Sequence, residues 1–180
     1  MMNNNDSSKT SQRKQQVAGL FDRVATTFDH VGPRFFSHFG RRLVELAHIP
    51  NGAHVLDVAT GRGAALIPAA ESVGTHGHVV GIDLSEIMVQ ETAKELTRLG
   101  FSSNVEARQM DAEHLQFPDE SFDYVLCAFG IFFFPQLDRA IDRNPFVGLA
   151  VAVVVQLVAP ALRSLPTNDT TWSFRLADTT

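Results

Sequence analysis

The chain has one cysteine, one tryptophan and one tyrosine among its 180 residues. Its only cysteine, Cys127, has no partner within the chain, which excludes an internal disulfide and favours a reducing, cytoplasmic location. No apolar stretch follows a basic start, so the polar residues 1–15 predict a disordered tail and not a secretory signal. The net charge of -5 lacks the basic excess that neutralises phosphates, so nucleic acid is not an expected partner.

Two glycine motifs that bind phosphate groups are also missing. A dinucleotide site has the pattern G-x-G-x-x-G, whereas counting from Gly61 gives Gly61, Gly63 and then Leu66. The phosphate-cradling pattern G-x-x-x-x-G-K-[ST] is absent. An acid, Asp57, ends the apolar run before the glycines, and its charge would repel a pyrophosphate. A nicotinamide-dependent oxidoreductase is therefore disfavoured.

The most informative segment that is present is His54-Val-Leu-Asp-Val-Ala-Thr-Gly-Arg-Gly-Ala-Ala65, which predicts a buried strand, a glycine turn and a helix start. A second apolar run ends in Asp83, whose carboxylate can accept hydrogen bonds from both hydroxyls of a ribose. Asp57 suits a cation such as the ammonium of an amino acid. S-adenosylmethionine has a nucleoside at one end and an amino acid at the other, so these residues predict it as the ligand.

Apolar periodicity and turn residues divide the chain into alternating elements. Helices are predicted over residues 16–28, 33–47, 63–73 and 85–100, with a short one after Pro135, and strands over residues 54–59, 78–83, 104–110 and 122–128. This alternation predicts an α/β fold with a doubly wound, mostly parallel, Rossmann-like sheet. Ligands of such sheets bind beyond the carboxyl ends of the strands, where the predicted acids gather.

Four segments, in order, resemble the successive motifs of the class I S-adenosylmethionine-dependent methyltransferases, most closely the ubiquinone/menaquinone C-methyltransferase-like branch. They are Val55-Leu-Asp-Val-Ala-Thr-Gly-Arg-Gly63, Val79-Val-Gly-Ile-Asp-Leu-Ser85, Met110-Asp-Ala-Glu113 and Ser121-Phe-Asp-Tyr-Val-Leu-Cys127. Upstream, residues 17–29 are similar to the N-terminal helix of that branch and its aromatic-Asp pair, here Phe28-Asp29. The resemblance covers residues 17–142 and implies methyl transfer to a small, hydrophobic acceptor.

The resemblance also assigns roles to single residues. It gives the ribose to Asp83, the adenine amino group to Asp111 and a neighbouring backbone N–H to Ala112. Leu84 and Met88 either lie beside the adenine or belong to the ordinary core. The complete predicted set of cofactor-binding residues is Asp57, Ala59, Thr60, Gly61, Gly63, Asp83, Leu84, Met88, Asp111, Ala112 and Cys127.

Ala59 stands where the family usually has its first glycine, and Arg62 is expected to face solvent. Transfer from a sulfonium depends on alignment and exclusion of water, so no catalytic residue is predicted. His76 and His78 lack companion ligands, so no metal site is predicted. The phenylalanine-rich residues 129–134 either line a pocket for a hydrophobic acceptor or pack at a strand end, and Phe28-Asp29 belongs either to a lid or to the core.

The last part of the chain departs from the family. Residues 143–180 contain none of its motifs, and they have three interpretations. They replace the usual C-terminal strands with one strand and little more, they come from a truncated or frame-shifted gene, or residues 146–162 form a membrane segment. The abrupt onset favours a truncated or frame-shifted gene, whereas Gln156 and Pro160 weaken the membrane interpretation.

The predicted organisation is therefore a polar tail over residues 1–15, a cofactor-binding domain over 16–142 with lid helices at 16–48, and a divergent tail over 143–180. The alternative to an active enzyme is a truncated, non-catalytic protein that binds the cofactor weakly or serves only as an interaction module. The sequence does not indicate an oligomeric state or identify the methyl acceptor.

Overall fold

The computed structural model describes residues 4–29, 34–101, 104–136 and 151–153. Its helices are α1 (Asn4–Val24), α2 (Phe35–Ala47), α3 (Leu66–Val73) and α4 (Glu86–Arg98), and short 3-10 helices are η1 (Gly74–His76) and η2 (Gly130–Phe133). Its strands are β1 (His54–Val58), β2 (His78–Asp83), β3 (Val105–Gln109), β4 (Tyr124–Cys127) and β5 (Val151–Val153).

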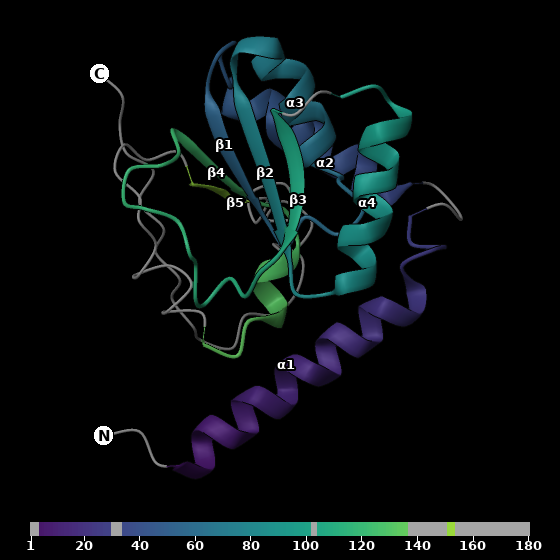
Figure 1. The fold of residues 1–180 in the computed structure, drawn as a ribbon, viewed down its shortest axis with the longest axis vertical. Coiled ribbons are helices and arrows are strands. Elements are labelled where there is room, and N and C mark those ends of the chain that lie inside the picture. The colour runs from purple at the N-terminus through teal and green to yellow at the C-terminus, as the bar shows by residue number, and fades with distance from the viewer. Residues whose placement is uncertain (1–3, 30–33, 102–103, 137–150, 154–180) are drawn as a thin grey trace, which may run out of the picture.

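The strands form one parallel sheet in the order β3-β2-β1-β4-β5 (Figure 1). β1 is central, because Leu56 is paired with Val80 of β2 on one side and with Val125 of β4 on the other. The order reverses between β1 and β4, so the carboxyl end of β1 lies at the switch point where such sheets bind ligands. The predicted fold class, a parallel Rossmann-like sheet flanked by helices, is confirmed.

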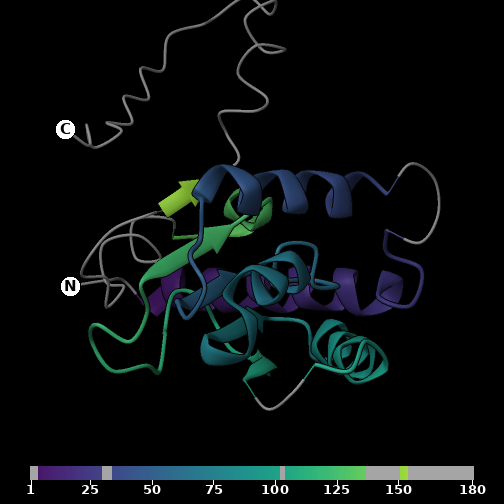
Figure 2. The ribbon, with the colours of Figure 1, turned by 90° about the horizontal axis from the view of Figure 1, so that it is seen from above.

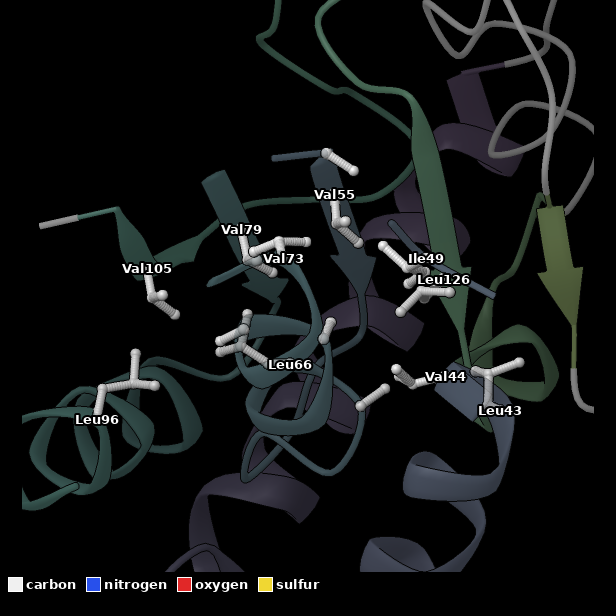
Figure 3. Close-up of a cluster of buried hydrophobic side chains, with 14 residues drawn as sticks. Leu43, Val44, Ile49, Val55, Leu66, Val73, Val79, Leu96, Val105 and Leu126 are labelled. Carbon is white, nitrogen blue, oxygen red and sulfur yellow. The ribbon is translucent and has the colours of Figure 1, made fainter. Parts of the chain in front are cut away.

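The strands β1, β2 and β4 are largely apolar on both faces, as expected where a parallel sheet is buried on both sides, whereas the edge strand β3 carries Glu106, Arg108 and Gln109. On one face, Val55, Val79 and Val105 point toward the side chains of α2, α3 and α4, and Leu66 of α3 lies among them (Figure 3). The opposite face carries Leu56, Val58, Val80, Ile82 and Val125, and the segment between β3 and β4 packs against it with Met110, Leu115 and Phe117. The two layers fix the strand ends, and with them the acids that follow the strands.

Helix α1 differs most from the prediction. It begins at Asn4, so the expectation of a disordered tail over residues 1–15 is wrong for residues 4–15. Lysine, glutamine and arginine are good helix formers, and Lys14 is held by ion pairs to two acids beyond β3. Figure 1 shows α1 as the long helix beneath the sheet, and in the view from above in Figure 2 it passes behind the sheet and α3.

The divergent tail contributes one described element, β5, which pairs with β4 in parallel from Val125↔Val151 to Cys127↔Val153. The helix expected after Pro135 and the rest of the apolar residues 146–162 lie outside the described residues. Within the residues that the structure describes, no helix is both long enough and apolar enough to cross a membrane.

Candidate functional site

A cavity of about 560 Å³ lies at the carboxyl ends of the strands, a volume typical of small-molecule sites. α1 covers it with Lys14, Val17, Ala18 and Phe21. Most of the predicted cofactor residues line this one cavity: Asp57, Ala59, Thr60, Gly61, Asp83, Leu84, Met88, Asp111 and Ala112. Residues from three separate sequence motifs therefore meet where the fold places a ligand.

The turn after β1 is fixed by hydrogen bonds at both faces of Gly61. The Gly61 N–H donates to Asp83 Oδ2 at 2.8 Å, and the Thr92 hydroxyl donates to the Gly61 carbonyl at 2.7 Å. Gly61 and Gly63 have φ angles of 53° and 80°, in the left-handed region that glycine adopts without strain. Ala59 also has a positive φ, 56°, which explains physically why a glycine suits this position. The turn presents a rigid backbone surface to the cavity.

Asp83 is the last residue of β2, and its carboxylate accepts hydrogen bonds from two backbone N–H groups. Its Oδ1 accepts from the Ser85 N–H at 2.9 Å, while its Oδ2 accepts from Gly61. Burial raises the pKa of Asp83, and the nearby Asp22 carboxylate raises it further. Each carboxylate oxygen offers two acceptor positions, so both oxygens keep one position for a ligand hydroxyl. Asp83 is therefore oriented and still able to bind the two hydroxyls of a ribose.

Asp57 lies near the carboxyl end of β1 and is buried, with 1% of its surface exposed. Its Oδ2 accepts a hydrogen bond from the Thr60 hydroxyl at 2.6 Å. Burial raises the pKa of Asp57 to about 7, against the smaller lowering effect of its hydrogen bonds. A cation that enters the cavity beside Asp57 would favour the ionised carboxylate, as expected for a site that binds an ammonium group.

Asp111 follows β3 and is held by three donors. Its Oδ2 accepts from Lys14 Nζ at 2.7 Å and lies 2.9 Å from His114 Nδ1, while its Oδ1 accepts from the Glu113 N–H at 3.0 Å. Burial alone would raise the pKa of Asp111, but the Lys14 ammonium and the other donors lower it overall. Asp111 is therefore an ionised acceptor at the end of the cavity opposite the phenylalanines described next.

Phenylalanines from four parts of the chain, α1, the residues after it, α2 and the segment after β4, form the other end of the cavity. Phe28 stacks on Phe36 with ring centroids 4.6 Å apart, and Phe21 meets Phe133 edge to face at 5.1 Å. Phe129, just beyond β4, lies 5.3 Å from Phe36. All five rings line the cavity, so of the two interpretations of residues 129–134, the one in which they line a pocket agrees with the geometry. The aromatic lining of this end suits an apolar molecule.

The two residues of the aromatic-Asp pair, Phe28 and Asp29, make different contacts. Phe28 lines the cavity, whereas the Asp29 carboxylate accepts hydrogen bonds from the N–H groups of Phe36 and Ser37 at 3.1 and 2.7 Å. Asp29 thus satisfies N–H groups at the start of α2 that have no partner within the helix. The pair joins the covering helices to each other and places the aromatic ring in the cavity.

Two predicted cofactor residues do not line the cavity. Gly63 lies behind the turn, where a side chain would meet Ile67 at 3.2 Å, and Cys127 belongs to the core of the sheet. Burial raises the pKa of the Cys127 thiol to about 12, which keeps it protonated and unreactive. Its neighbours Ala128 and Phe129, which follow the end of β4, reach the cavity instead.

Arg62 was expected to face solvent, and this prediction is wrong. Its side chain is 11% exposed, its Nη1 donates to the Ala25 carbonyl just after α1, and it lies 3.7 Å from Glu91 of α4. Sequence alone also missed Lys14 and Glu113 as parts of the site. The Glu113 carboxylate lay within the quoted motif Met110-Asp-Ala-Glu113, but its partner Lys14 stands far away in a polar segment with no motif.

No group of three histidine, cysteine or acidic side chains suited to a metal occurs in the part of the chain that the structure describes. Among the histidines, His114 pairs with Asp111 at 2.9 Å.

Comparison with known proteins agrees with this geometry. A family described as "Methyltransferase domain" matches residues 55–144, half of the chain. The chain belongs to this methyltransferase family. The match begins at β1, ends near the predicted departure at Asp142, and confirms the predicted family together with its cofactor class, S-adenosylmethionine.

Relatives within the methyltransferase family are similar over the same region. Aklanonic acid methyltransferase DauC of Streptomyces sp. (strain C5) is 43% identical over 133 residues, which cover 74% of this chain and 60% of that protein. The ubiquinone/menaquinone biosynthesis C-methyltransferase UbiE of Pseudomonas fluorescens (strain Pf0-1) is 37% identical over 128 residues, or 67% of this chain and 49% of that protein. The chain thus spans about half to three fifths of the length of these relatives.

Among solved structures, a SAM-dependent methyltransferase from Aquifex aeolicus superposes with a TM-score of 0.59 at 25% identity. The superposition covers 67% of this chain and 63% of that one. The sheet and its covering helices are therefore those of the methyltransferase fold.

Proposed function

We propose that this chain binds S-adenosylmethionine and transfers its methyl group to a small, hydrophobic acceptor. The observation that carries the proposal is the meeting of three acids, Asp57, Asp83 and Asp111, with the Gly61 turn around one cavity that ends in phenylalanines. S-adenosylmethionine combines a cationic amino acid, a ribose and an adenine in that order. The relatives, named for aklanonic acid and for ubiquinone/menaquinone biosynthesis, support a small-molecule acceptor.

The proposed contacts divide the cofactor among three strand ends. Asp57 and the Gly61 turn hold the amino acid portion, Asp83 holds the ribose hydroxyls, and Asp111 accepts from the adenine amino group beside the Ala112 N–H. Leu84 and Met88 provide apolar surface at the adenine. When bound, the cofactor supplies a methyl group activated on a sulfonium.

The protein's contribution to the reaction is alignment in a dry cavity. The phenylalanine end would hold an apolar acceptor against the methyl group, and α1 would exclude water from above. We propose no catalytic base: Asp29 and Glu113 also line the cavity, but the N–H groups at the start of α2 and the Lys14 ammonium occupy their carboxylates. A cytoplasmic location, indicated by the single cysteine, also remains a prediction.

The experiment is calorimetric titration of the purified chain with S-adenosylmethionine and S-adenosylhomocysteine. Asp83→Ala is expected to abolish measurable binding, whereas Asp119→Ala, an exposed acid outside the cavity, is the matched control and should bind like the parent. Failure of the folded parent to bind either ligand would contradict the proposal.

Acceptor screening with methyl-labelled cofactor follows once binding is established. Label transfer to a hydrophobic acceptor supports an active enzyme. Tight cofactor binding with no transfer to planar aromatic or quinone-like acceptors would favour the non-catalytic alternative.

A further inference from the structure

We propose that Lys14 is a positioning residue of the cofactor site, which fastens α1 over its adenine end and holds the Asp111 carboxylate in place. The inference rests on the proposed function, in which Asp111 accepts from the adenine amino group. It assigns a task to a residue in a segment that carries no family motif, and it makes the retention of the cofactor depend on the position of α1.

The Lys14 ammonium lies between two carboxylates. Its Nζ is 2.7 Å from Asp111 Oδ2 and 2.6 Å from Glu113 Oε2. The Lys14 side chain is 14% exposed and that of Glu113 only 1%. Although burial opposes it, the two carboxylates raise the pKa of Lys14, so the charge is retained inside the cavity wall.

Ligand binding at Asp111 need not release Lys14. Asp111 Oδ2 accepts from Lys14 and pairs with His114, whereas Oδ1 accepts one hydrogen bond, from the Glu113 N–H. A carboxylate oxygen offers two acceptor positions, so Oδ1 keeps one for an adenine amino group. Lys14 also pairs with the buried Glu113, whose charge would be costly to leave without a cation, so Lys14 stays in place when the ligand binds.

A second set of contacts fastens α1 further along. Asp22 Oδ1 accepts from the Ser85 hydroxyl at 2.5 Å and from the Ile87 N–H at 3.3 Å, at the start of α4. Arg62 of the glycine turn donates to the Ala25 carbonyl just beyond the helix. Lys14 and Asp22 are separated by roughly 12 Å along the helix axis, since each residue rises about 1.5 Å.

The part of α1 between these two anchors is the part that covers the cavity. Val17, Ala18 and Phe21 all face into it. With both anchors in place the helix is held against the strand ends, and without Lys14 only the Asp22 end remains fixed. The adenine end of the cavity would then open more often, and the bound cofactor would leave faster.

The test measures dissociation of S-adenosylmethionine from the full chain by stopped-flow displacement, together with amide hydrogen exchange in α1. Lys14→Met is expected to speed dissociation on the order of tenfold, a typical size for coupling between a ligand and a conformational equilibrium. Exchange should rise in the first half of α1 and stay unchanged in α3. Lys14→Arg should restore most of the retention, and Lys9→Met, an exposed lysine on the same helix, should behave like the parent.

Lys14→Met leaves Glu113 buried without its cation, and this could impair folding. The double variant Lys14→Met/Glu113→Gln removes both charges and keeps the shape of the side chain, so it should fold and still release the cofactor faster. Parent-like dissociation and parent-like α1 exchange in either folded variant would overturn the inference. If the parent itself does not bind the cofactor, the proposed function fails first, which is a separate outcome.

Discussion

The polar and the aromatic ends of the cavity are assembled in different ways. At the polar end, Asp57, Asp83 and Asp111 each stand at or directly after a strand, within a short continuous motif. At the aromatic end, the rings come from α1, from the residues after it, from α2 and from the segment after β4.

This difference separates two kinds of recognition. The acids are fixed by the sheet register and by backbone hydrogen bonds, so the polar end can distinguish one ligand. The rings are held mainly by contact with one another, and such surfaces accept alternative apolar shapes with little cost. A family can therefore keep its cofactor while its acceptor changes, and the following predictions test whether the two ends can be altered independently.

The largest effect is expected at Asp57. Because its native pKa, about 7, lies above that of an unfolded aspartate, the native state holds the proton more tightly, and stability falls as pH rises from about 4 to 7. Between pH 5 and 7 the parent should lose about 2 kcal/mol through this group, because the slope of about 1.4 kcal/mol per unit diminishes as the native carboxyl titrates near pH 7. Asp57→Asn should flatten that slope in urea unfolding followed by circular dichroism. An unchanged slope would show that Asp57 is not the group responsible.

Gly63 tests the rigidity of the turn behind the polar end. Gly63→Val adds left-handed strain and crowds Ile67 at 3.2 Å, whereas Gly100→Val adds similar strain at φ 77° in open space. The free energy of unfolding should fall by about 2 kcal/mol more in Gly63→Val than in the control. Equal losses in denaturant titrations would mean that the turn yields and that the polar end is less rigid than described.

Phe129 tests the independence of the aromatic end. Phe129→Leu should weaken binding of a planar probe, anthraquinone-2-carboxylate, on the order of tenfold, equivalent to about 1.4 kcal/mol. The affinity for S-adenosylmethionine should change less than about twofold, which corresponds to less than about 0.4 kcal/mol of binding free energy. Phe101→Leu, which packs in the core away from the cavity, is the matched control. A large loss of cofactor affinity in calorimetry would show that the two ends of the cavity are energetically coupled, and would contradict their independence.

Ala59 should give the smallest effect, and a favourable one. Ala59→Gly removes the strain of a positive φ, 56°, and should raise stability by about 1 kcal/mol or less, since glycine also gains entropy in the unfolded chain. Ala53→Gly, at a buried alanine without a positive φ, should lower stability instead. Thermal unfolding of both variants would show whether the polar end contains relievable strain.

Sequence alone predicted the polar end closely, because its information is local. The second strand was predicted over residues 78–83, as observed, and Ser85 caps α4 by accepting from the Met88 N–H. The helix after the glycine turn was predicted to begin at residue 63 but begins at Leu66, since the turn itself takes up the intervening residues.

The parts that could not be predicted depend on partners far apart in the chain. Residues 4–15 have too few apolar residues to show helical periodicity, and what orders them is an ion pair across the cavity. The sequence around Arg62 is typical of a surface position, and its burial depends on contact with the distant residue Ala25, just after α1. Cys127 was assigned to the site by its place in a motif, but a shift of one residue along a strand exchanges the cavity side for the core.

Lys14 and Asp111 are 97 positions apart in the chain, a larger sequence separation than that of any residue pair between β1 and β4. Closing that distance costs chain entropy that only a nearly complete structure can offset, so we expect α1 to dock late, after the sheet has formed. A ligand that binds only the form with α1 docked would shift the equilibrium of this last folding step toward the docked form. The amount of active protein in a cell would then depend on the supply of its own cofactor.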